Sequence, residues 1–290
     1  MKKVNLFFFV SDLHGHIDRY RKLLQLVRSE RPAAVFLGGD LLPHRRISLQ
    51  SVHSANQSFI DSYLIPEFSQ LKKEMFSAYP EIFLILGNDD EGAEEVKVQG
   101  GAQSELWKYV HFQKTAFNDY AIYGYCFVPP SPFLLKDWEK YDVSRYVDPG
   151  CISPEEGFRS IPLDEIEIRN ATIQDDLQKF TAGENLDKSI FLFHSPPYQT
   201  RLDRAALDGR MVDHVPMDVH VGSIAIKRFI EERQPLITLH GHVHESTRLT
   251  GVWKERMGNT WAFNAAHDGS ELAVVKFDPE KPAEATRELY

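Results

Sequence analysis

Five short apolar runs, each followed at once by a glycine or a polar residue, constrain the fold of this chain most strongly. The runs are rich in β-branched and aromatic residues, and they have the length of strands that are buried on both faces. Stretches in which apolar residues recur at helical spacing separate the first three runs. The five runs are residues 4–10, 34–37, 82–86, 190–193 and 236–239. This order predicts an α/β fold with a largely parallel sheet and right-handed crossovers.

Side chains that can bind a metal ion come directly after these runs. Because the carboxyl ends of parallel strands lie along one edge of a sheet, where ligands bind, we expect these side chains to meet there. Asp12 and His14 are two residues apart, so in an extended backbone an oxygen and a nitrogen donor lean the same way. Each residue alone has an ordinary interpretation as a helix cap, a turn residue or a surface histidine. The full set is Asp12, His14, Asp40, Asn88, His194, His242 and His244.

The set resembles the motifs of the calcineurin-like metallophosphoesterases, in particular those of the small bacterial and archaeal members. The matching motifs, in family order, are Asp12-x-His14, Gly39-Asp40, Gly87-Asn88, His194 and Gly241-His242-x-His244. The resemblance covers residues 4–277 and implies a four-layer α/β/β/α sandwich of two mostly parallel or mixed sheets, with the site above them. It also implies two metal ions that share Asp40. The implied ligands are Asp12, His14, Asp40 and His244 for one ion, and Asp40, Asn88, His194 and His242 for the other.

The donor types and the charge of this set predict the chemistry. Carboxylate and imidazole donors together suit manganese, iron or zinc, so we expect two divalent transition-metal ions, with manganese favoured and iron or zinc as alternatives. After the carboxylates of Asp12 and Asp40 are counted, two such ions leave a charge of about +2, which attracts phosphate. A water whose pKa the ions lower would attack phosphorus directly, without a covalent phosphoenzyme.

The expected function is therefore metal-dependent hydrolysis of a small-molecule phosphate ester. We favour phosphodiesterase activity over phosphomonoesterase activity. Two alternatives stay open: a nuclease of the same superfamily, and a catalytically weak scaffold on this fold that binds partners. Intact ligands argue against the scaffold, because a scaffold does not need them.

One position departs from the family pattern. The commoner family motif is Gly-Asn-His-Glu or Gly-Asn-His-Asp, whose histidine helps to protonate the leaving group. In this chain Asp89 takes the place of that histidine. We expect Asp89 to act either as a general acid or, as we favour, to orient a ligand such as His194 or His242. His16 is a second candidate catalytic residue, with a place at the start of a helix as its alternative.

Other polar residues have less defined expectations. His240 is expected to pack against or support a ligand loop, and His267 is a candidate for lining the site. For the three arginines of the loop after His194, we favour a solvated loop over a phosphate contact; they are Arg201, Arg204 and Arg210. The remaining histidines are expected to be ordinary surface or core residues; they are His44, His53, His111, His214 and His220.

Composition limits the partners and the compartment. The formal net charge is −9 and there is no basic block, which argues against nucleic acid as a partner. Cys126 and Cys151 form no C-x-x-C pair, which fits buried thiols in a reducing compartment, with one disulfide as the alternative. No segment approaches the length of a membrane span, and the apolar N-terminal run has no small-residue cleavage site. We therefore expect a cytoplasmic protein with no membrane contact.

We expect a single domain over residues 1–290 with an insertion or lid at 129–188, which is rich in Pro, Asp and Glu and contains a helix near Thr172–Phe180. Residues 116–128 are expected to form paired strands. Pro66 is expected to separate two helical segments. Three antiparallel strands are predicted after His244, with peripheral residues at the end of the chain; the ranges are Ser246–Val252, Thr260–Asn264, Leu272–Phe277 and Pro279–Tyr290.

Overall fold

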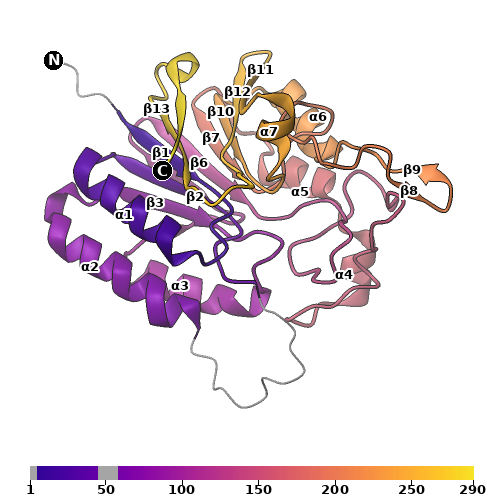
Figure 1. Cartoon of the computed structure of the whole chain (residues 1–290), viewed down its shortest axis with the longest axis horizontal. Helices are drawn as coiled ribbons and strands as arrows, with labels where there is room; N and C mark the ends of the chain where they lie inside the picture. The colour runs from indigo at the N-terminus through magenta and orange to yellow at the C-terminus, as the bar shows by residue number, and fades with distance from the viewer. Residues whose placement is uncertain (1–4, 45–57) are drawn as a thin grey trace.

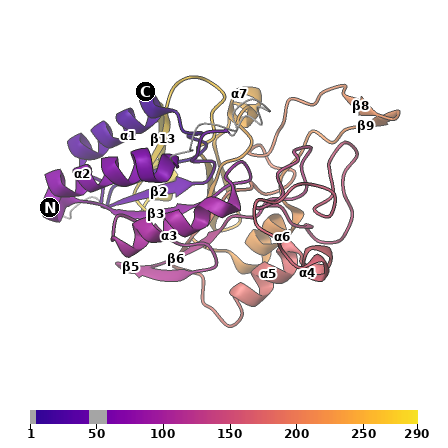
Figure 2. The same ribbon diagram turned by 90° about the horizontal axis from the view of Figure 1, so that it is seen from below.

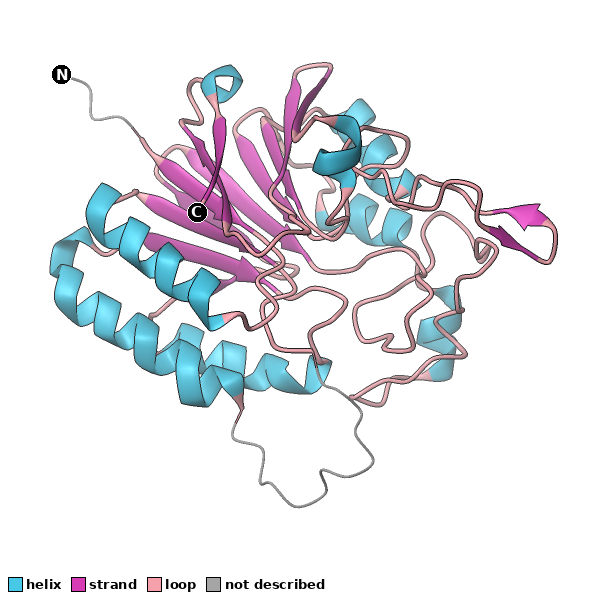
Figure 3. Cartoon of the chain, in the orientation of Figure 1, coloured by secondary structure: helices cyan, strands magenta, loops and turns pink. Residues whose placement is uncertain are grey.

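Two six-stranded mixed sheets face each other, with helices on their outer sides (Figures 1 and 3). The computed structural model describes residues 5–44 and 58–290. The order of the first sheet is β14-β13-β1-β2-β3-β4, and that of the second is β11-β12-β10-β7-β6-β5. This is the four-layer α/β/β/α sandwich that the sequence motifs imply.

The central strands of each sheet run parallel, with antiparallel strands on one side of the first sheet and on both sides of the second. In the first sheet, β1, β2, β3 and β4 are parallel. In the second sheet, β6, β7, β10 and β12 are parallel. The first sheet consists of β1 (Phe7–Val10), β2 (Ala34–Gly38), β3 (Glu81–Ile85), β4 (Lys108–Tyr109), β13 (Ala273–Phe277) and β14 (Thr286–Leu289). The second consists of β5 (Lys114–Phe117), β6 (Tyr120–Tyr125), β7 (Ser189–Phe193), β10 (Ile237–His240), β11 (Lys254–Met257) and β12 (Thr260–Asn264). A separate hairpin, β8 (Met211–Val212) with β9 (Val215–Pro216), projects from the body of the molecule (Figure 1).

The helices cover the outer faces of the two sheets. Helices α1, α2 and α3 lie along the first sheet, whereas α5 and α6 lie along the second (Figures 1 and 2). The helices are α1 (Ile17–Glu30), α2 (Ile65–Met75), α3 (Glu95–Gln103), α4 (Glu165–Asn170), α5 (Ile173–Phe180), α6 (Ile224–Arg233) and α7 (Ser246–Thr250). Helix α1 buries Tyr20, Leu23, Leu24 and Val27 on one stripe, as their helical spacing predicts. It ends at Arg31, which has a left-handed backbone (φ 50°) directly before Pro32.

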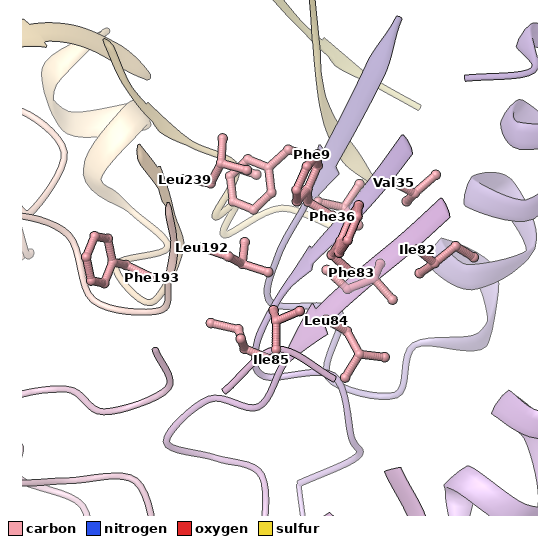
Figure 4. Close-up of a cluster of buried hydrophobic side chains, with 14 of the residues drawn as sticks. Phe9, Val35, Phe36, Ile82, Phe83, Leu84, Ile85, Leu192, Phe193 and Leu239 are labelled. Carbon is pink, nitrogen blue, oxygen red and sulfur yellow. The ribbon is translucent and has the colours of Figure 1, made fainter. Parts of the chain in front are cut away.

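The main core lies between the two sheets. Phe36, Phe83, Ile85, Leu192 and Leu239 point into this space from both sides (Figure 4). All five side chains, two aromatic and three aliphatic, are fully buried. Their neighbours along the strands, such as Val35 and Phe193, point to the helix side (Figure 4) and are buried as well. The strands therefore bury both faces, which explains why the sequence shows continuous apolar runs rather than alternation.

Several sequence-based expectations about individual elements are wrong. Pro66 does not separate two helices, because a π-helical turn (Ile60–Leu64) runs directly into α2 and Pro66 is the second residue of α2. Ser246–Val252 is not a strand: its first five residues form α7, which Gly251 ends with a left-handed backbone (φ 70°). Strand β13 joins the first sheet, antiparallel to β1, and β12 runs parallel to β10. The last residues are peripheral, as expected, and form the largely exposed edge strand β14.

Residues 129–188 consist mostly of loops that are fastened to both sheets. The expected helix near Thr172–Phe180 is confirmed as α5, and the Thr172 side chain caps its N-terminus. A fully buried ion pair joins Lys136 to Glu139 at 2.5 Å. Asp137 accepts a hydrogen bond of 2.7 Å from the backbone N–H of Gly92, just beyond β3. The ion pair lies within the segment, the Asp137 contact ties it to the loop that follows β3, and Tyr125 of β6 in the second sheet donates to Asp176 at 2.8 Å.

Both cysteines are free thiols, Cys126 buried and Cys151 half-buried, so the alternative of a disulfide between them is wrong. Within residues 5–44 and 58–290, no helix is long and apolar enough to cross a membrane.

Candidate metal centre

The carboxyl ends of five central strands, three from the first sheet and two from the second, converge on one cluster of polar side chains. Asp12, Asp40 and Asn88 follow β1, β2 and β3 of the first sheet. The second sheet contributes His194 after β7, and His242 and His244 after β10. The structure therefore brings together the side chains that the sequence singles out, at the ends of two sheets rather than along the edge of one.

The loops that present these side chains have unusual backbone conformations. Asp12, His14, Asp40 and His242 have left-handed backbones, with φ values of 58°, 46°, 52° and 71°. Non-glycine residues adopt this region rarely, and such strain persists only where surrounding contacts hold it. Here the N–H of Asp12 donates to the carbonyl of Gly39 at 3.0 Å, and that of His14 to the carbonyl of Asp40 at 2.8 Å. The loops after β1 and β2 thus hold each other.

The donor atoms fall into two groups that share one carboxylate. One donor atom from each member of the first group lies within 4.8 Å of the others; the group is Asp12, His14, Asp40 and His244. The same holds for the second group, which is Asp40, His194 and His242. Asn88 adjoins the second group, since its Oδ1 is 3.0 Å from His194 Nε2. Asp40 therefore lies where two ions would meet.

The charge distribution of the cluster suits bound cations. Burial would by itself raise the pKa of Asp40, but His194 outweighs it and holds that pKa well below its usual range. Conversely, burial would lower the pKa of His194, but Asp40 raises it to about 10. Asp12 likewise raises the pKa of His244 to about 9 against the effect of burial. Imidazolium groups thus balance the carboxylates in a place where metal cations would do so.

A close contact between two imidazole nitrogens gives a second indication of the same kind. His14 Nε2 lies 3.1 Å from His244 Nε2, a contact between two nitrogens that a shared cation would stabilise. The other nitrogen of His14, Nδ1, is buried without a hydrogen-bond partner. Carboxylate, amide and imidazole donors in this arrangement fit a dinuclear transition-metal centre.

Comparison with known proteins identifies the family. Residues 6–246 match the sequence model of the calcineurin-like phosphoesterases. The chain belongs to this family. It is accordingly a metal-dependent phosphoesterase, and the resemblance of its five motifs is confirmed. A search among curated proteins gives no match.

Solved structures share the fold of this phosphoesterase. A protein from Thermus thermophilus is 15% identical, with 99% of both chains covered and a TM-score of 0.56. A dimetal phosphatase from Danio rerio is 10% identical over 99% of this chain and 96% of the other, with a TM-score of 0.52. Identities this low show that the architecture is shared and leave the substrate open.

Hydrogen bonds around the cluster hold the candidate ligands of this phosphoesterase in place. His194 Nδ1 donates to the carbonyl of Gly38 at 2.8 Å, which leaves Nε2 for the cluster. His240 Nδ1 donates to the carbonyl of Ser195 at 2.9 Å, and burial lowers the pKa of His240 to about 4. The expectation that His240 supports a ligand loop is confirmed. Across the sheets, the backbone N–H of His242 donates to Asp12 Oδ1 at 3.0 Å.

Asp89 lies at the cluster, where it contacts the proposed ligand Asn88 and two histidines of the first sheet. Its Oδ1 accepts a hydrogen bond from Asn88 Nδ2 at 3.0 Å. Its Oδ2 lies 3.3 Å from His44 Nδ1 and 3.8 Å from His14 Nδ1. Burial, with the charge of Asp40 as a second cause, raises the pKa of Asp89 to about 8. The hydrogen bond of Asp89 to a proposed ligand is therefore made with Asn88 rather than with His194 or His242, and its role as an orienting residue stays a prediction.

The remaining candidate residues lie outside the cluster. His16 is exposed and stands directly before α1, beside a cavity of about 420 Å³ that Arg19 and Gly269 also line. His267 Nε2 pairs with Glu271 Oε2 at 3.2 Å. Arg204 is paired with Asp208 rather than directed at the cluster. His53 lies outside the described residues.

Sequence reasoning misses two residues, His44 and Asp90. His44 is not an ordinary surface or core histidine, because its ring stacks on that of His14 at 4.3 Å. It follows β2 in a polar connection, and no sequence signal marks it. Asp90 is fully buried and accepts hydrogen bonds from the backbone N–H groups of Leu41, Leu42 and Gly87. The sequence does carry a signal for Asp90, because it stands at the acidic position of the family motif.

Gly87 is expected to be irreplaceable, because a Cβ there would lie 2.3 Å from Asp40 Oδ1 and 2.7 Å from His194 Cε1. Gly87→Ala should displace Asp40 and lower metal affinity about 10- to 100-fold, the usual effect of disturbing the support of a ligand. Metal titration of the purified variant measures this. Gly100→Ala is the matched control: its Cβ would meet no atom within 4 Å, and alanine favours the helix α3. Unchanged metal affinity in Gly87→Ala would contradict the close approach.

Proposed function

We propose that this phosphoesterase hydrolyses a small-molecule phosphodiester at a dinuclear manganese centre. The proposed ligands are Asp12, His14, Asp40 and His244 for one ion, and Asp40, Asn88, His194 and His242 for the other. The observation that carries the proposal is the position of Asp40, whose carboxylate belongs to both groups of donor atoms. Iron and zinc suit the same donors and are the alternative metals.

The residues of the cluster have separate tasks in this proposal. When bound, the two cations supply Lewis-acid stabilisation of phosphoryl oxygens and a lowered pKa for the attacking water. Asp40 Oδ1 accepts the N–H of Asp89 at 2.8 Å, which fixes the carboxylate between the two groups. Asp12 is held by the backbone of His242 from the opposite sheet. These fixed contacts reduce the rearrangement that the reaction requires.

The charges around the cluster support a diester over a monoester. A monoester dianion needs more positive charge than a diester monoanion, and arginine is the usual additional donor. Arg19 adjoins the cluster, but its guanidinium already donates hydrogen bonds to the carbonyls of Asp12 and Gly269 and is not directed at a phosphate. In the metal-loaded centre, where nearby cations favour its charged form, Asp89 adds a further carboxylate beside the ligands. We therefore propose that a substrate with one negative charge is preferred.

The test compares two chromogenic esters on one metal-loaded preparation. Protein stripped of metal is reloaded with manganese, iron or zinc, and kcat/KM is measured on bis(4-nitrophenyl) phosphate and 4-nitrophenyl phosphate. The proposal predicts about two ions per chain, the highest rate with manganese and a diester preference of about tenfold or more. A preference for the monoester would overturn the proposed substrate class. Rapid cleavage of an oligonucleotide would favour the nuclease instead.

A further inference from the structure

An imidazole that is not part of either donor group stands at the open side of the metal centre. His44 belongs to the connection after β2, and its side chain is 59% exposed. Its ring lies nearly parallel to that of His14, at 18° and a centroid distance of 4.3 Å. His44 is therefore held beside the ligands, in a position that solvent and a substrate can reach.

A carboxylate fixes one of the two ring nitrogens of His44. Asp89 Oδ2 lies 3.3 Å from His44 Nδ1, while Asp89 Oδ1 accepts from Asn88 Nδ2. Both oxygens of Asp89 thus have partners, His44 and Asn88, and its side chain is only 22% exposed. An imidazole whose Nδ1 faces a carboxylate has its Nε2 available for proton transfer. Asp89 itself has no oxygen free to donate a proton to a leaving group, because its oxygens face Asn88 and His44.

We propose that His44 is the leaving-group proton donor of this phosphoesterase, and that Asp89 positions its ring. The proposal rests on the metal centre described under the proposed function. In the step, the P–O bond to the leaving group breaks and leaves its electron pair on the leaving oxygen. The proton of His44 Nε2 moves to that oxygen, and the attacking water forms the new P–O bond and releases one proton to solvent. The chain thus supplies from position 44 the imidazole that position 89 lacks.

Leaving groups of graded basicity test the proposal. Aryl and alkyl methyl phosphodiesters with 4-nitrophenol, phenol or a simple alcohol as the leaving group are compared on wild type and His44→Gln. Loss of a general acid should lower kcat about 10²- to 10⁴-fold for phenol and the alcohol, and about threefold or less for 4-nitrophenol. A diester with sulfur in the bridging position should also react nearly normally in His44→Gln, because a thiolate leaves without a proton. His214→Gln, at the exposed turn between β8 and β9, is the matched control.

Asp89 is tested by its effect on the same series. Asp89→Ala removes the partner of His44 Nδ1 and should steepen the dependence on the leaving group in the same direction. Asp89→Asn keeps an acceptor oxygen and should restore part of the rate on poor leaving groups. An equal loss on every ester in both His44→Gln and Asp89→Ala would overturn the proposal, because a structural role lowers all rates alike.

Two readouts are independent of turnover. Metal analysis of His44→Gln should give the wild-type metal content. The distances among His14, His44 and Asp89 would also allow a further metal site. Loss of an ion in His44→Gln would reveal such a site and would overturn the proposal. In zinc-loaded protein, which is diamagnetic, saturated with a non-hydrolysable aryl phosphonate, the ring protons of His44 should show a nuclear Overhauser contact with the aryl group. Binding without that contact would also overturn it. Failure of wild type to bind the phosphonate or to cleave any ester would instead contradict the proposed function.

Discussion

Asp40→Ala is expected to lose more than one of the two bound metal ions and nearly all activity. Asp40 is the one carboxylate that belongs to both donor groups, so its removal weakens both sites at once. Lewis-acid stabilisation is worth several kcal/mol, so the loss in turnover should be about 10³-fold or more. Metal content is measured by mass spectrometry of the dialysed protein, and turnover on the chromogenic diester.

A matched control separates this effect from a general loss of negative charge. Asp213 lies at the exposed turn of the β8–β9 hairpin, and Asp213→Ala should keep both ions and full activity. If Asp40→Ala kept its metal and its rate, the dinuclear assignment would be wrong. Loss of a single ion with partial activity would place Asp40 in one site only.

Asp90→Ala is expected to lower the stability of the fold more than any of the other substitutions. Its carboxylate accepts three buried backbone N–H groups, from Leu41 at 3.1 Å, Leu42 at 2.8 Å and Gly87 at 2.9 Å. Each buried donor that loses its partner costs about 1–3 kcal/mol, so the free energy of unfolding should fall by about 3–5 kcal/mol. Urea denaturation of the metal-free protein measures this without a contribution from bound ions.

The conservative variant tests the cause of that loss. Asp90→Asn keeps one acceptor oxygen and should lose less stability than Asp90→Ala. Because Asp90 joins the loop after β2 to the loop after β3, both variants should also show weaker metal binding once loaded. A change of less than about 1 kcal/mol in Asp90→Ala would show that water replaces the carboxylate.

The sequence predicts the site better than it predicts the sheets. Metal-competent residues stand directly after buried apolar runs, and this local pattern holds in the structure for Asp12, Asp40 and His194. Membership of a sheet depends on pairing between distant segments, so the antiparallel pairing of β13 with β1 has no local signal. The segment after His244 resembles a strand because of its threonines, but the backbone closes into the short helix α7.

The partners of Asp89 are unpredictable for the same reason. His44 follows β2 and Asp89 follows β3, and these strands are adjacent in the first sheet. Their side chains meet only because parallel pairing brings the two strand ends together. In the sequence, position 89 shows only that the histidine of the commoner family motif is missing. The three-dimensional structure shows that the imidazole of His44 lies beside the cluster.

The division of the donors between two sheets links metal selectivity to the hydrophobic core. The first sheet presents all the oxygen donors and one imidazole, and the second presents three imidazoles. The distance between the donors of the first sheet and those of the second depends on the side chains that fill the space between the sheets. Phe83 and Phe117 are two of these side chains, and their ring centroids are 5.6 Å apart. A substitution in that apolar layer can therefore change which ion fits without touching a ligand. During evolution, the metal preference of such a protein can therefore change when substitutions alter the volume of its core.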